Sequence, residues 1–385
     1  MGITVFCVCY LQGRKQEEAA PMKRVLVAMS GGVDSSVAAL LLKQQGFDCV
    51  GCTMKLYSND VLSKKSEKTC CALDDVEDAR SVAFRLGMPF YVMNLSETFQ
   101  TRVIDPFIQS YIAGRTPNPC IDCNRFLKFE KLYERALAIS CDAIATGHYA
   151  RITEDGGRYY LKKARDPAKD QSYVLYSLKQ DELKRTLFPL GELSKEETRR
   201  LADQNGFLNA HKPDSQDICF VPDGDYAAFI KRSTGCEFPE GNFVDRNGNI
   251  LGRHKGIIHY TVGQRRGLGV SAKNRLYVSA IDPVRNTVTL SEEEDFLVDT
   301  VFADNVSMVS GEPPAGGCRV LVKLRYRQQE RPAVAWMENE RLTLRLDAPQ
   351  RAPAPGQAAV IYDLDGETVL GGGTITGSER RKDAI

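Results

Sequence analysis

Short apolar runs alternate with helical patterns through the first 150 residues of the chain. The apolar runs lie at 25–29, 49–54, 90–94 and 143–146, and the helical patterns lie near 34–45, 74–86, 97–113 and 126–138. This alternation predicts an α/β fold with a parallel, doubly wound sheet. Because ligands bind beyond the carboxyl ends of the strands in such a sheet, we expect the binding crevice after Met29, after Met54 and at Gly147-His148.

The segment after the first apolar run predicts an anion-binding turn. Ser30-Gly31-Gly32-Val33-Asp34-Ser35 joins the run directly to the next helical pattern. Two glycines without a Cβ let the backbone approach phosphate oxygens, and the amides and positive dipole of a helix start point at the same place. The spacing of a Walker A loop is absent, so no lysine is placed for a γ-phosphate. We therefore expect cleavage between the α- and β-phosphates, with an ordinary glycine turn as the alternative.

The second half of the chain has a different pattern. A polar stretch rich in proline and glycine, near 212–253, ends the α/β alternation, and the runs that follow alternate as β-strands do. These runs lie at 319–327, 332–338, 341–346, 357–363 and 367–375. Their spacing predicts a small barrel or sandwich. We divide the chain into an unstructured extension over 1–21, a nucleotide-binding catalytic domain over 22–222, a small central domain over 223–295 and a C-terminal β-barrel over 296–378.

Composition limits the partners and the compartment. The net charge is only +1, so binding of nucleic acid must depend on local basic surfaces. No apolar run approaches the roughly 18 residues that span a bilayer, so no membrane partner is expected. Twelve cysteines in a large chain without a secretory signal favour a reducing, cytoplasmic compartment over a disulfide scaffold.

Three cysteines lie in segments that suggest chemistry. Cys120 and Cys123 follow two prolines, and we expect them on a loop before a helix that opens near Phe126. A thiol at a helix N-terminus is acidified, and Arg125 adds to that effect. Cys219 lies about a hundred residues later. The pattern fits a sulfur-handling or redox pair between the loop and Cys219, an iron–sulfur site on all three thiols, or inert buried thiols, and sequence leaves these open.

Seven short motifs together resemble one family. They are Ser-Gly-Gly-Val-Asp-Ser at 30–35, Arg-Thr-Pro-Asn-Pro at 115–119 with Cys-Asn at 123–124, Ala-Thr-Gly-His-Tyr at 145–149, Lys-Asp-Gln-Ser-Tyr at 169–173, Cys-Phe at 219–220, Tyr-Thr-Val-Gly-Gln-Arg at 260–265 and Arg-Tyr-Arg at 325–327. In this order they resemble the bacterial tRNA-specific 2-thiouridylase family of PP-loop ATP pyrophosphatases. The resemblance runs from Met22 to about Gly377.

The resemblance implies a fold, a reaction and partners. The fold would be that of the adenine nucleotide alpha hydrolases, and the reaction 2-thiolation of the wobble uridine of tRNA. ATP with Mg²⁺ would adenylate the C2 oxygen of the uridine. Cys219 would carry a persulfide and Cys123 would be its partner thiol. The partners would be a tRNA with a modifiable wobble uridine and a persulfide donor, either a cysteine desulfurase or a relay protein.

Motif matching also implies two sets of binding residues. Those for ATP are Ala28, Met29, Ser30, Gly31, Gly32, Val33, Asp34, Ser35, Met54 and Gly147. Those for tRNA are Asn118, Pro119, Cys120, His148, Lys169, Asp170, Gln171, Arg325, Tyr326 and Gln357. The alternation of 319–327 further predicts a row of Lys323, Arg325 and Arg327 on one strand face, spaced to meet backbone phosphates.

One position departs from the family pattern. Many members have Asp where this chain has Cys120, so the general base proposed there has no counterpart, and Asp122 is displaced by two residues. The substitution strengthens the alternative of a [4Fe-4S] cluster held by Cys120, Cys123 and Cys219. Other rivals are a different PP-loop enzyme, such as an amide-forming synthetase or the 4-thiouridine enzyme, and a noncatalytic RNA-binding or redox-sensing protein.

Overall fold

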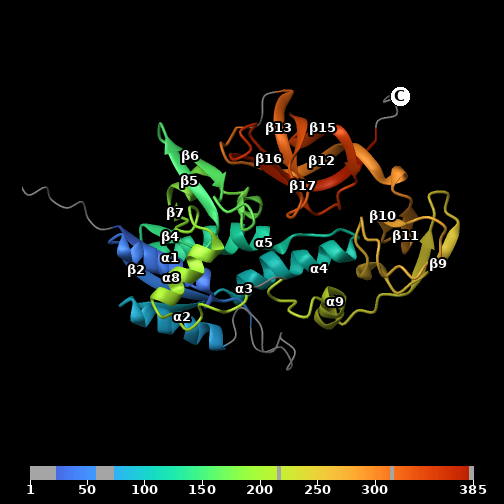
Figure 1. Ribbon diagram of the computed structural model, residues 1–385. Helices are drawn as coiled ribbons and strands as arrows, with labels where there is room; N and C mark the ends of the chain where they lie inside the picture. The colour runs from blue at the N-terminus through green and yellow to red at the C-terminus, as the bar shows by residue number, and fades with distance from the viewer. Residues whose placement is uncertain (1–22, 58–72, 215–217, 313–315, 381–385) are drawn as a thin grey trace, which may run out of the picture.

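A parallel five-stranded sheet forms the centre of the N-terminal half. The computed structural model describes residues 23–57, 73–214, 218–312 and 316–380 (Figure 1). The strand order is β3-β2-β1-β4-β7, and every neighbouring pair is parallel. The strands are β1 (Arg24–Ala28), β2 (Asp48–Lys55), β3 (Phe90–Asn94), β4 (Ala143–Ala145) and β7 (Thr186–Leu187). The predicted doubly wound sheet is therefore confirmed.

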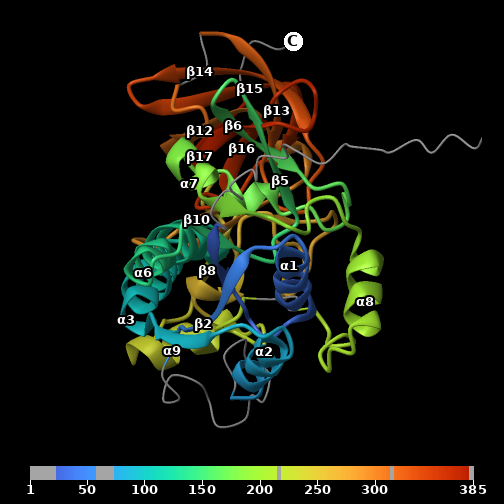
Figure 2. The ribbon, with the colours of Figure 1, turned by 90° about the vertical axis from the view of Figure 1, so that its left-hand side faces the viewer.

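Helices cover both faces of this sheet because alternate residues of β1 point to opposite sides. Val25 and Val27 pack in a cluster with residues of α1 (Val33–Gln44), α2 (Leu73–Arg85) and α8 (Lys195–Gln204). Leu26 and Ala28 pack in a second cluster, which includes residues of α6 (Leu132–Ala138). Figure 2 shows α6 and α8 on the two sides of the sheet.

The segment expected to be a cysteine loop is helical, so that prediction is wrong. Helical structure runs without a break through α5 (Pro119–Asp122), the π-helical segment η2 (Cys123–Lys131) and α6. Pro119 takes the first helical position, where its missing N–H costs nothing. Asn118 is the N-cap, and its side-chain oxygen accepts a hydrogen bond from the Cys120 amide at 3.2 Å. The prolines thus start the helix, and Cys120 and Cys123 lie in its first turns.

A second helical segment packs against this one. It is built from α3 (Ser96–Phe99), the π-helical η1 (Gln100–Ile104) and α4 (Asp105–Ile112), in agreement with the predicted 97–113. After β4 the chain forms a hairpin of β5 (Ala150–Asp155) and β6 (Arg158–Lys163). The short helices η3 (Ser172–Leu175) and α7 (Gln180–Lys184) then lead to β7.

The central part of the chain forms a small sheet beside α4. After α9 (Tyr226–Thr234), the strand order is β10-β11-β8-β9. The strands are β8 (Gly241–Val244), β9 (Ile250–His254), β10 (Tyr277–Asp282) and β11 (Thr287–Ser291), with short helices η4 (Ile257–His259) and η5 (Glu294–Phe296). Phe243 of this sheet and Phe107 of α4 belong to one hydrophobic cluster, so the two parts share a core.

The C-terminal part is a closed antiparallel barrel, as predicted. Its order is β12-β15-β14-β13-β16-β17. The strands are β12 (Leu297–Met308), β13 (Cys318–Lys323), β14 (Arg331–Glu338), β15 (Arg341–Arg351), β16 (Ala358–Tyr362) and β17 (Val369–Glu379). Alternate residues Val320 and Val322 fill the barrel core. Closure pairs both edges of the sheet, so neither edge strand of the barrel is left without a partner.

The predicted row of basic residues is wrong. Strand β13 ends at Lys323, and the chain then turns, with the Gln328 amide bonded to the Arg325 carbonyl at 3.1 Å. The Lys323 side chain is only 12% exposed and forms an ion pair with Glu330 at 3.6 Å. Alternation of apolar residues continues to Tyr326 in sequence, but the hydrogen-bonded ladder does not.

The remaining predictions concern the N-terminal extension, the domain boundaries and the membrane. The extension over 1–21 lies outside the described residues, and the proposed domain boundaries stay predictions. Among the residues that the structure describes, no helix is both long and apolar enough to cross a membrane.

Candidate functional site

The turn after β1 has one position that only glycine can occupy. Gly31 has φ +76°, and a Cβ built on it would lie 2.2 Å from the backbone oxygen of Asp75. Gly32 is the N-cap of α1 and has no side chain to fill the space in front of the helix. The turn therefore leaves the first amides of α1 available to an anion.

Hydroxyl and amide side chains support the turn from behind. Ser35 Oγ donates to the Gly32 carbonyl at 3.0 Å and accepts from the Ser30 amide at 3.1 Å. Ser36 Oγ donates to the same carbonyl at 3.1 Å. Asn209 Nδ2 donates to the Gly31 carbonyl and to Ser36 Oγ, both at 2.9 Å. Carbonyl groups that would repel an anion are thus engaged, whereas sequence reasoning missed Asn209 because it lies in no motif.

The end of β4 approaches the same turn. A Cβ on Gly147 would lie 2.7 Å from the Ser35 amide nitrogen, so this position also needs glycine. The side chains of Ala28, Met29 and Val33 are buried in the core. Of these predicted ATP-binding residues, only the backbone can face a ligand. The structure thus brings together the strand ends that the alternation indicated.

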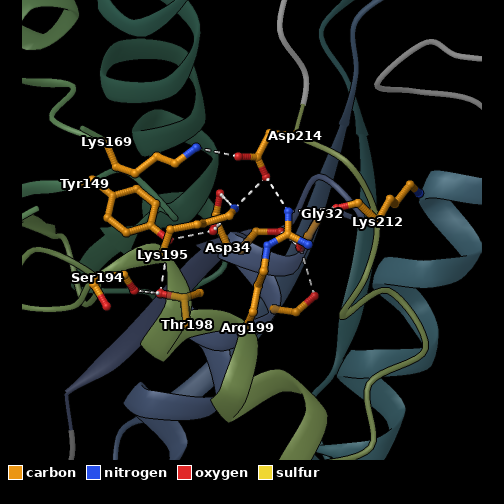
Figure 3. A network of polar contacts seen from close by, with 12 residues as sticks. Gly32, Asp34, Tyr149, Lys169, Ser194, Lys195, Thr198, Arg199, Lys212 and Asp214 are labelled. Carbon is orange, nitrogen blue, oxygen red and sulfur yellow. Dashed lines mark hydrogen bonds and ion pairs between the residues drawn. The ribbon is translucent and has the colours of Figure 1, made fainter.

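A network of charged side chains lies beside the turn (Figure 3). Asp34, in the first turn of α1, accepts from Lys195 Nζ at 2.7 Å and from the Tyr149 hydroxyl at 2.8 Å. Lys195 also forms an ion pair with Asp214 at 2.6 Å. Lys195 therefore links the first turn of α1 to the segment that leads toward Cys219.

Asp214 is the centre of this network. It accepts from Lys169 at 2.7 Å and from Arg199 at 3.3 Å as well as from Lys195. Burial by itself would raise the pKa of Asp214, but the bonds from Lys169 and Lys195 outweigh it and lower the pKa below its usual value. Figure 3 shows these side chains converging from separate segments. Sequence reasoning missed Lys195, Arg199 and Asp214, because no local spacing signals cations that meet only after folding.

Cys123 and Cys219 flank the same hydrophobic cluster. Phe220, next to Cys219, is buried in it, with its ring 5.2 Å from that of Phe107 and 5.6 Å from that of Phe99. Met54, at the carboxyl end of β2, packs against this cluster as well. The two thiols that are far apart in sequence therefore pack against one cluster, which also contacts Met54 at the carboxyl edge of the parallel sheet.

Cys120, Cys123 and Cys219 do not form a metal-binding site in the structure. In the described ranges, no group of three or more His, Cys, Asp or Glu side chains is placed to hold a metal ion. Cys120 is exposed, whereas Cys123 and Cys219 are half-buried. A cluster needs its thiolates converging on one point, so this arrangement does not fit a preassembled [4Fe-4S] site.

Asp122 precedes Cys123 in the chain and is a weaker acid than an ordinary aspartate. Burial raises its pKa to about 6, and nearby Arg125 opposes that rise. A carboxyl group with this pKa exchanges a proton near neutral pH. Asp122 is thus the acid nearest in sequence to the position where Cys120 replaces the family aspartate.

Residues that the resemblance implied for tRNA fall into two groups. Asn118, Pro119 and Cys120 form the start of α5, where Cys120 is exposed. The others form hydrogen bonds within the protein, and among them Tyr326 is exposed (37%). Gln357 Nε2 donates to the Thr116 carbonyl at 2.8 Å, Gln171 Oε1 accepts from the Tyr149 amide at 2.9 Å, and Tyr326 OH donates to the Asp170 carbonyl at 3.3 Å.

Arg325 and His148 are less exposed to solvent than residues that contact tRNA would be. Arg325 is partly buried and donates to the Ala352 carbonyl at 3.3 Å. His148 is buried, with its ring 6.0 Å from that of Phe129. Its Nε2 faces Lys128 Nζ at 3.3 Å, and its Nδ1 faces Thr146 Oγ1 at 2.7 Å. Since an ammonium group only donates, Nε2 accepts and Nδ1 carries the proton.

Comparison with known proteins covers nearly all of the chain. The tRNA methyl transferase HUP domain family matches residues 23–223, the tRNA methyl transferase PRC-barrel domain family matches 227–292, and the aminomethyltransferase beta-barrel domain family matches 298–375. The tRNA-specific 2-thiouridylase MnmA of Lachnoclostridium phytofermentans is 49% identical over 357 residues, which cover 92% of this chain and 99% of that relative.

The chain belongs to the tRNA-specific 2-thiouridylase family. The corresponding protein of Clostridioides difficile is 47% identical over 92% of this chain and 98% of that relative. The family resemblance drawn from seven motifs is therefore confirmed. A solved 4-thiouridine synthetase–RNA complex is 18% identical, with a TM-score of 0.36, and covers 55% of this chain and 50% of that one. A likeness that low carries no functional argument.

Proposed function

We propose that this chain is a tRNA-modifying sulfurtransferase that thiolates C2 of the wobble uridine at the expense of ATP. One observation carries the proposal: Cys123 and Cys219, far apart in sequence, flank one hydrophobic cluster, which reaches Met54 at the carboxyl edge of the sheet that bears the phosphate turn. Relatives of this chain at 45–49% identity are named tRNA-specific 2-thiouridylases.

In this proposal the phosphate turn and α1 bind the nucleotide. Gly31, Gly32 and the first amides of α1 hold the pyrophosphate part, and Lys195 lies beside them. ATP with Mg²⁺ supplies an adenylate that makes the C2 oxygen of uridine a leaving group. The turn then keeps the released pyrophosphate, and AMP leaves with the oxygen when sulfur attacks C2.

The two thiols divide the sulfur chemistry. Cys219 carries the persulfide received from a donor, which we propose to be a cysteine desulfurase or a relay protein. The thiolate of Cys123 attacks the inner sulfur of that persulfide, and the outer sulfur leaves as sulfide, which attacks the adenylated C2. A disulfide between Cys123 and Cys219 forms, and an external thiol must reduce it before the next turnover. Cys123 lies in the second turn of the helix that opens at Pro119.

The test is nucleoside mass spectrometry of tRNA after incubation with ATP, Mg²⁺ and a desulfurase with cysteine. We expect 2-thiouridine at the wobble position and pyrophosphate release that depends on tRNA. Cys219→Ser should abolish thiolation and keep tRNA-dependent pyrophosphate release, whereas Cys236→Ser, at an exposed cysteine, should change neither. Thiolation by Cys219→Ser protein would remove the sulfur-carrier role, and pyrophosphate release without any need for tRNA would favour a different PP-loop enzyme.

The same assay decides the iron–sulfur alternative. Because the described residues do not converge on a metal site, we expect iron-free protein to keep full thiolation activity. Protein purified without oxygen that contains about four irons per chain, and loses thiolation when the iron is removed, would instead support a cluster.

A further inference from the structure

Three cations meet one carboxylate beside the phosphate turn, and the mechanism above does not need that carboxylate. Asp214 accepts from Lys169 at 2.7 Å, from Lys195 at 2.6 Å and from Arg199 at 3.3 Å. The Lys195 side chain is only 11% exposed, and that of Asp214 is 22% exposed. Interactions between such shielded charges are stronger than between charges at an open surface.

The cluster is adjacent to the place where a phosphate binds. Asp34 belongs to the first turn of α1, and its second oxygen accepts from Lys195 at 2.9 Å. Lys195 thus bridges the helix start that attracts anions and the carboxylate of Asp214. An anion bound to the turn would compete for the cation that Asp214 now holds.

The charge balance of the cluster favours such an exchange. Lys169, Lys195 and Arg199 contribute three positive charges, against two negative charges from Asp34 and Asp214. Loss of Asp214 from the cluster would leave two uncompensated positive charges, and partly buried cations without a partner are costly. The phosphates of a nucleotide offer the same type of acceptor with more charge, so they can replace the carboxylate.

The chain around Asp214 also allows the carboxylate to leave without disturbing α8. Lys212 is held separately by ion pairs to Asp75 and Asp78 of α2, the latter at 2.7 Å. Lys195 and Arg199 belong to α8, which has its own N-terminal capping box. The cations and Asp214 therefore lie on different segments. Displacement of the carboxylate changes its contacts with the cations, next to the 3.5 Å contact of Arg199 with the Lys212 carbonyl.

We propose that Asp214 is an internal anion that occupies Lys169, Lys195 and Arg199 in the nucleotide-free chain, and that the phosphates of ATP displace it to bind these cations. This proposal rests on the proposed function, because it takes ATP as the ligand of the turn. It assigns phosphate binding to Lys195 and Arg199, and it gives Asp214 the role of a competitor rather than a ligand of the nucleotide.

The test is isothermal titration calorimetry of the full chain with magnesium pyrophosphate and with magnesium ATP. If Asp214 competes with phosphate, Asp214→Asn should bind both ligands about tenfold more tightly than the wild type. Asp203→Asn removes a negative charge from α8, the helix that carries Lys195 and Arg199, but at a side chain that contacts His211 instead of the cluster, so it should leave affinity unchanged. Equal or weaker binding by Asp214→Asn overturns the proposal, and weaker binding would assign Asp214 to the magnesium ion.

A second variant keeps the test decisive if Asp214→Asn does not fold. Arg199→Gln removes the cation that makes the longest contact with Asp214, on a side chain that is 34% exposed. We expect it to weaken pyrophosphate binding about fivefold or more. Unchanged affinity would exclude Arg199 from the phosphate site and overturn the proposal. If the wild-type chain binds neither ligand, the proposed function fails instead, and the two failures are distinguishable.

Discussion

Gly31 occupies a backbone conformation and a space that no other residue type fits. Its φ is +76°, and the backbone of Asp75 lies where a Cβ would project. The Gly-Gly pair after an apolar run predicts such a turn because only glycine combines a positive φ with close approach. Sequence could not predict the cations beside the turn, because lysine and arginine are common on any helix surface. Their partners follow no local pattern: Asp214 lies 15 to 45 residues from the cations, and Asp34 lies 161 residues from Lys195.

The first prediction concerns Gly31→Ala. We expect the free energy of unfolding to fall by about 1–3 kcal/mol from backbone strain alone, and more from the contact with Asp75. ATP binding should be lost even where the protein still folds, because the amides of α1 shift. Urea unfolding and calorimetry measure the two effects. Gly46→Ala is the matched control, since Gly46 has φ +86° but no atom within 4 Å of the added Cβ. It should lose stability but keep ATP affinity.

The second prediction concerns His148 and pH. Burial, and then the charge of Lys128, hold the pKa of His148 well below its usual value, so the folded protein resists protonation. Its contribution to stability is therefore complete above about pH 6.5 and is lost as the pH falls below that value, by up to about 1.4 kcal/mol per pH unit.

Urea unfolding at pH 7.5 and pH 5.5 checks this sign. We expect His148→Gln to reduce the difference in unfolding free energy between the two pH values. His211→Gln is the control, because the His211 side chain is 84% exposed. A pH difference that His148→Gln leaves unchanged would contradict the assignment of a buried neutral imidazole.

The helices α5 and α8 begin at N-cap residues that sequence patterns identify only in part. The prolines before Cys120 favour a loop when only the sequence is considered. In the structure, Asn118 is the N-cap of α5 and Pro119 is its first residue, a position where proline is favoured. The capping box of α8, formed by Ser194 and Glu197, also follows a known sequence pattern. The local sequence does not show that Lys195 and Arg199 of α8 lie beside the glycine turn, so it does not show that this capping box supports the site.

The third prediction concerns the cap of α8. Ser194 accepts from the Glu197 amide at 3.2 Å, so Ser194→Ala should lower the free energy of unfolding by about 1 kcal/mol. Because Lys195 is the first residue of α8, fraying of this end should also weaken ATP binding by several-fold. Ser194→Asp, which keeps a cap acceptor, should restore stability. ATP affinity unaffected by Ser194→Ala would separate the start of α8 from the nucleotide site.

At the scale of the molecule, the barrel and the N-terminal α/β half share a core. Tyr173, fully buried in the N-terminal half, donates to the Ala358 carbonyl of β16 at 2.8 Å. Val360 and Tyr362 of the barrel pack in one cluster with Leu26 of β1. The segment before α5 is held as well, because the Thr116 amide donates to the Pro355 carbonyl at 2.8 Å. The barrel thus positions the helix that bears Cys123.

The fourth prediction follows from this shared core. The single tryptophan, Trp336, lies in β14, so its fluorescence reports the barrel, while helical circular dichroism reports the N-terminal half. We expect the two probes to give the same denaturant midpoint. Tyr173→Phe should lower the free energy of unfolding by about 1 kcal/mol and move both midpoints together. Tyr91→Phe, at a half-exposed tyrosine, is the control. A fluorescence midpoint that does not move would show that the barrel unfolds independently.

The sequence by itself determined the central parallel sheet and the turn after its first strand, but not the helix that begins at Pro119. Alternation of apolar residues, adjacent glycines and closely spaced motifs are local properties, so they specified the parallel sheet, the phosphate turn and the family. Only the tertiary structure decided which charges meet beside the turn, that Cys123 and Cys219 flank one cluster, and that Lys323 and Arg325 are turned inward. These outcomes depend on contacts between segments far apart in the chain, whose energies come from burial and charge pairing that no local pattern records.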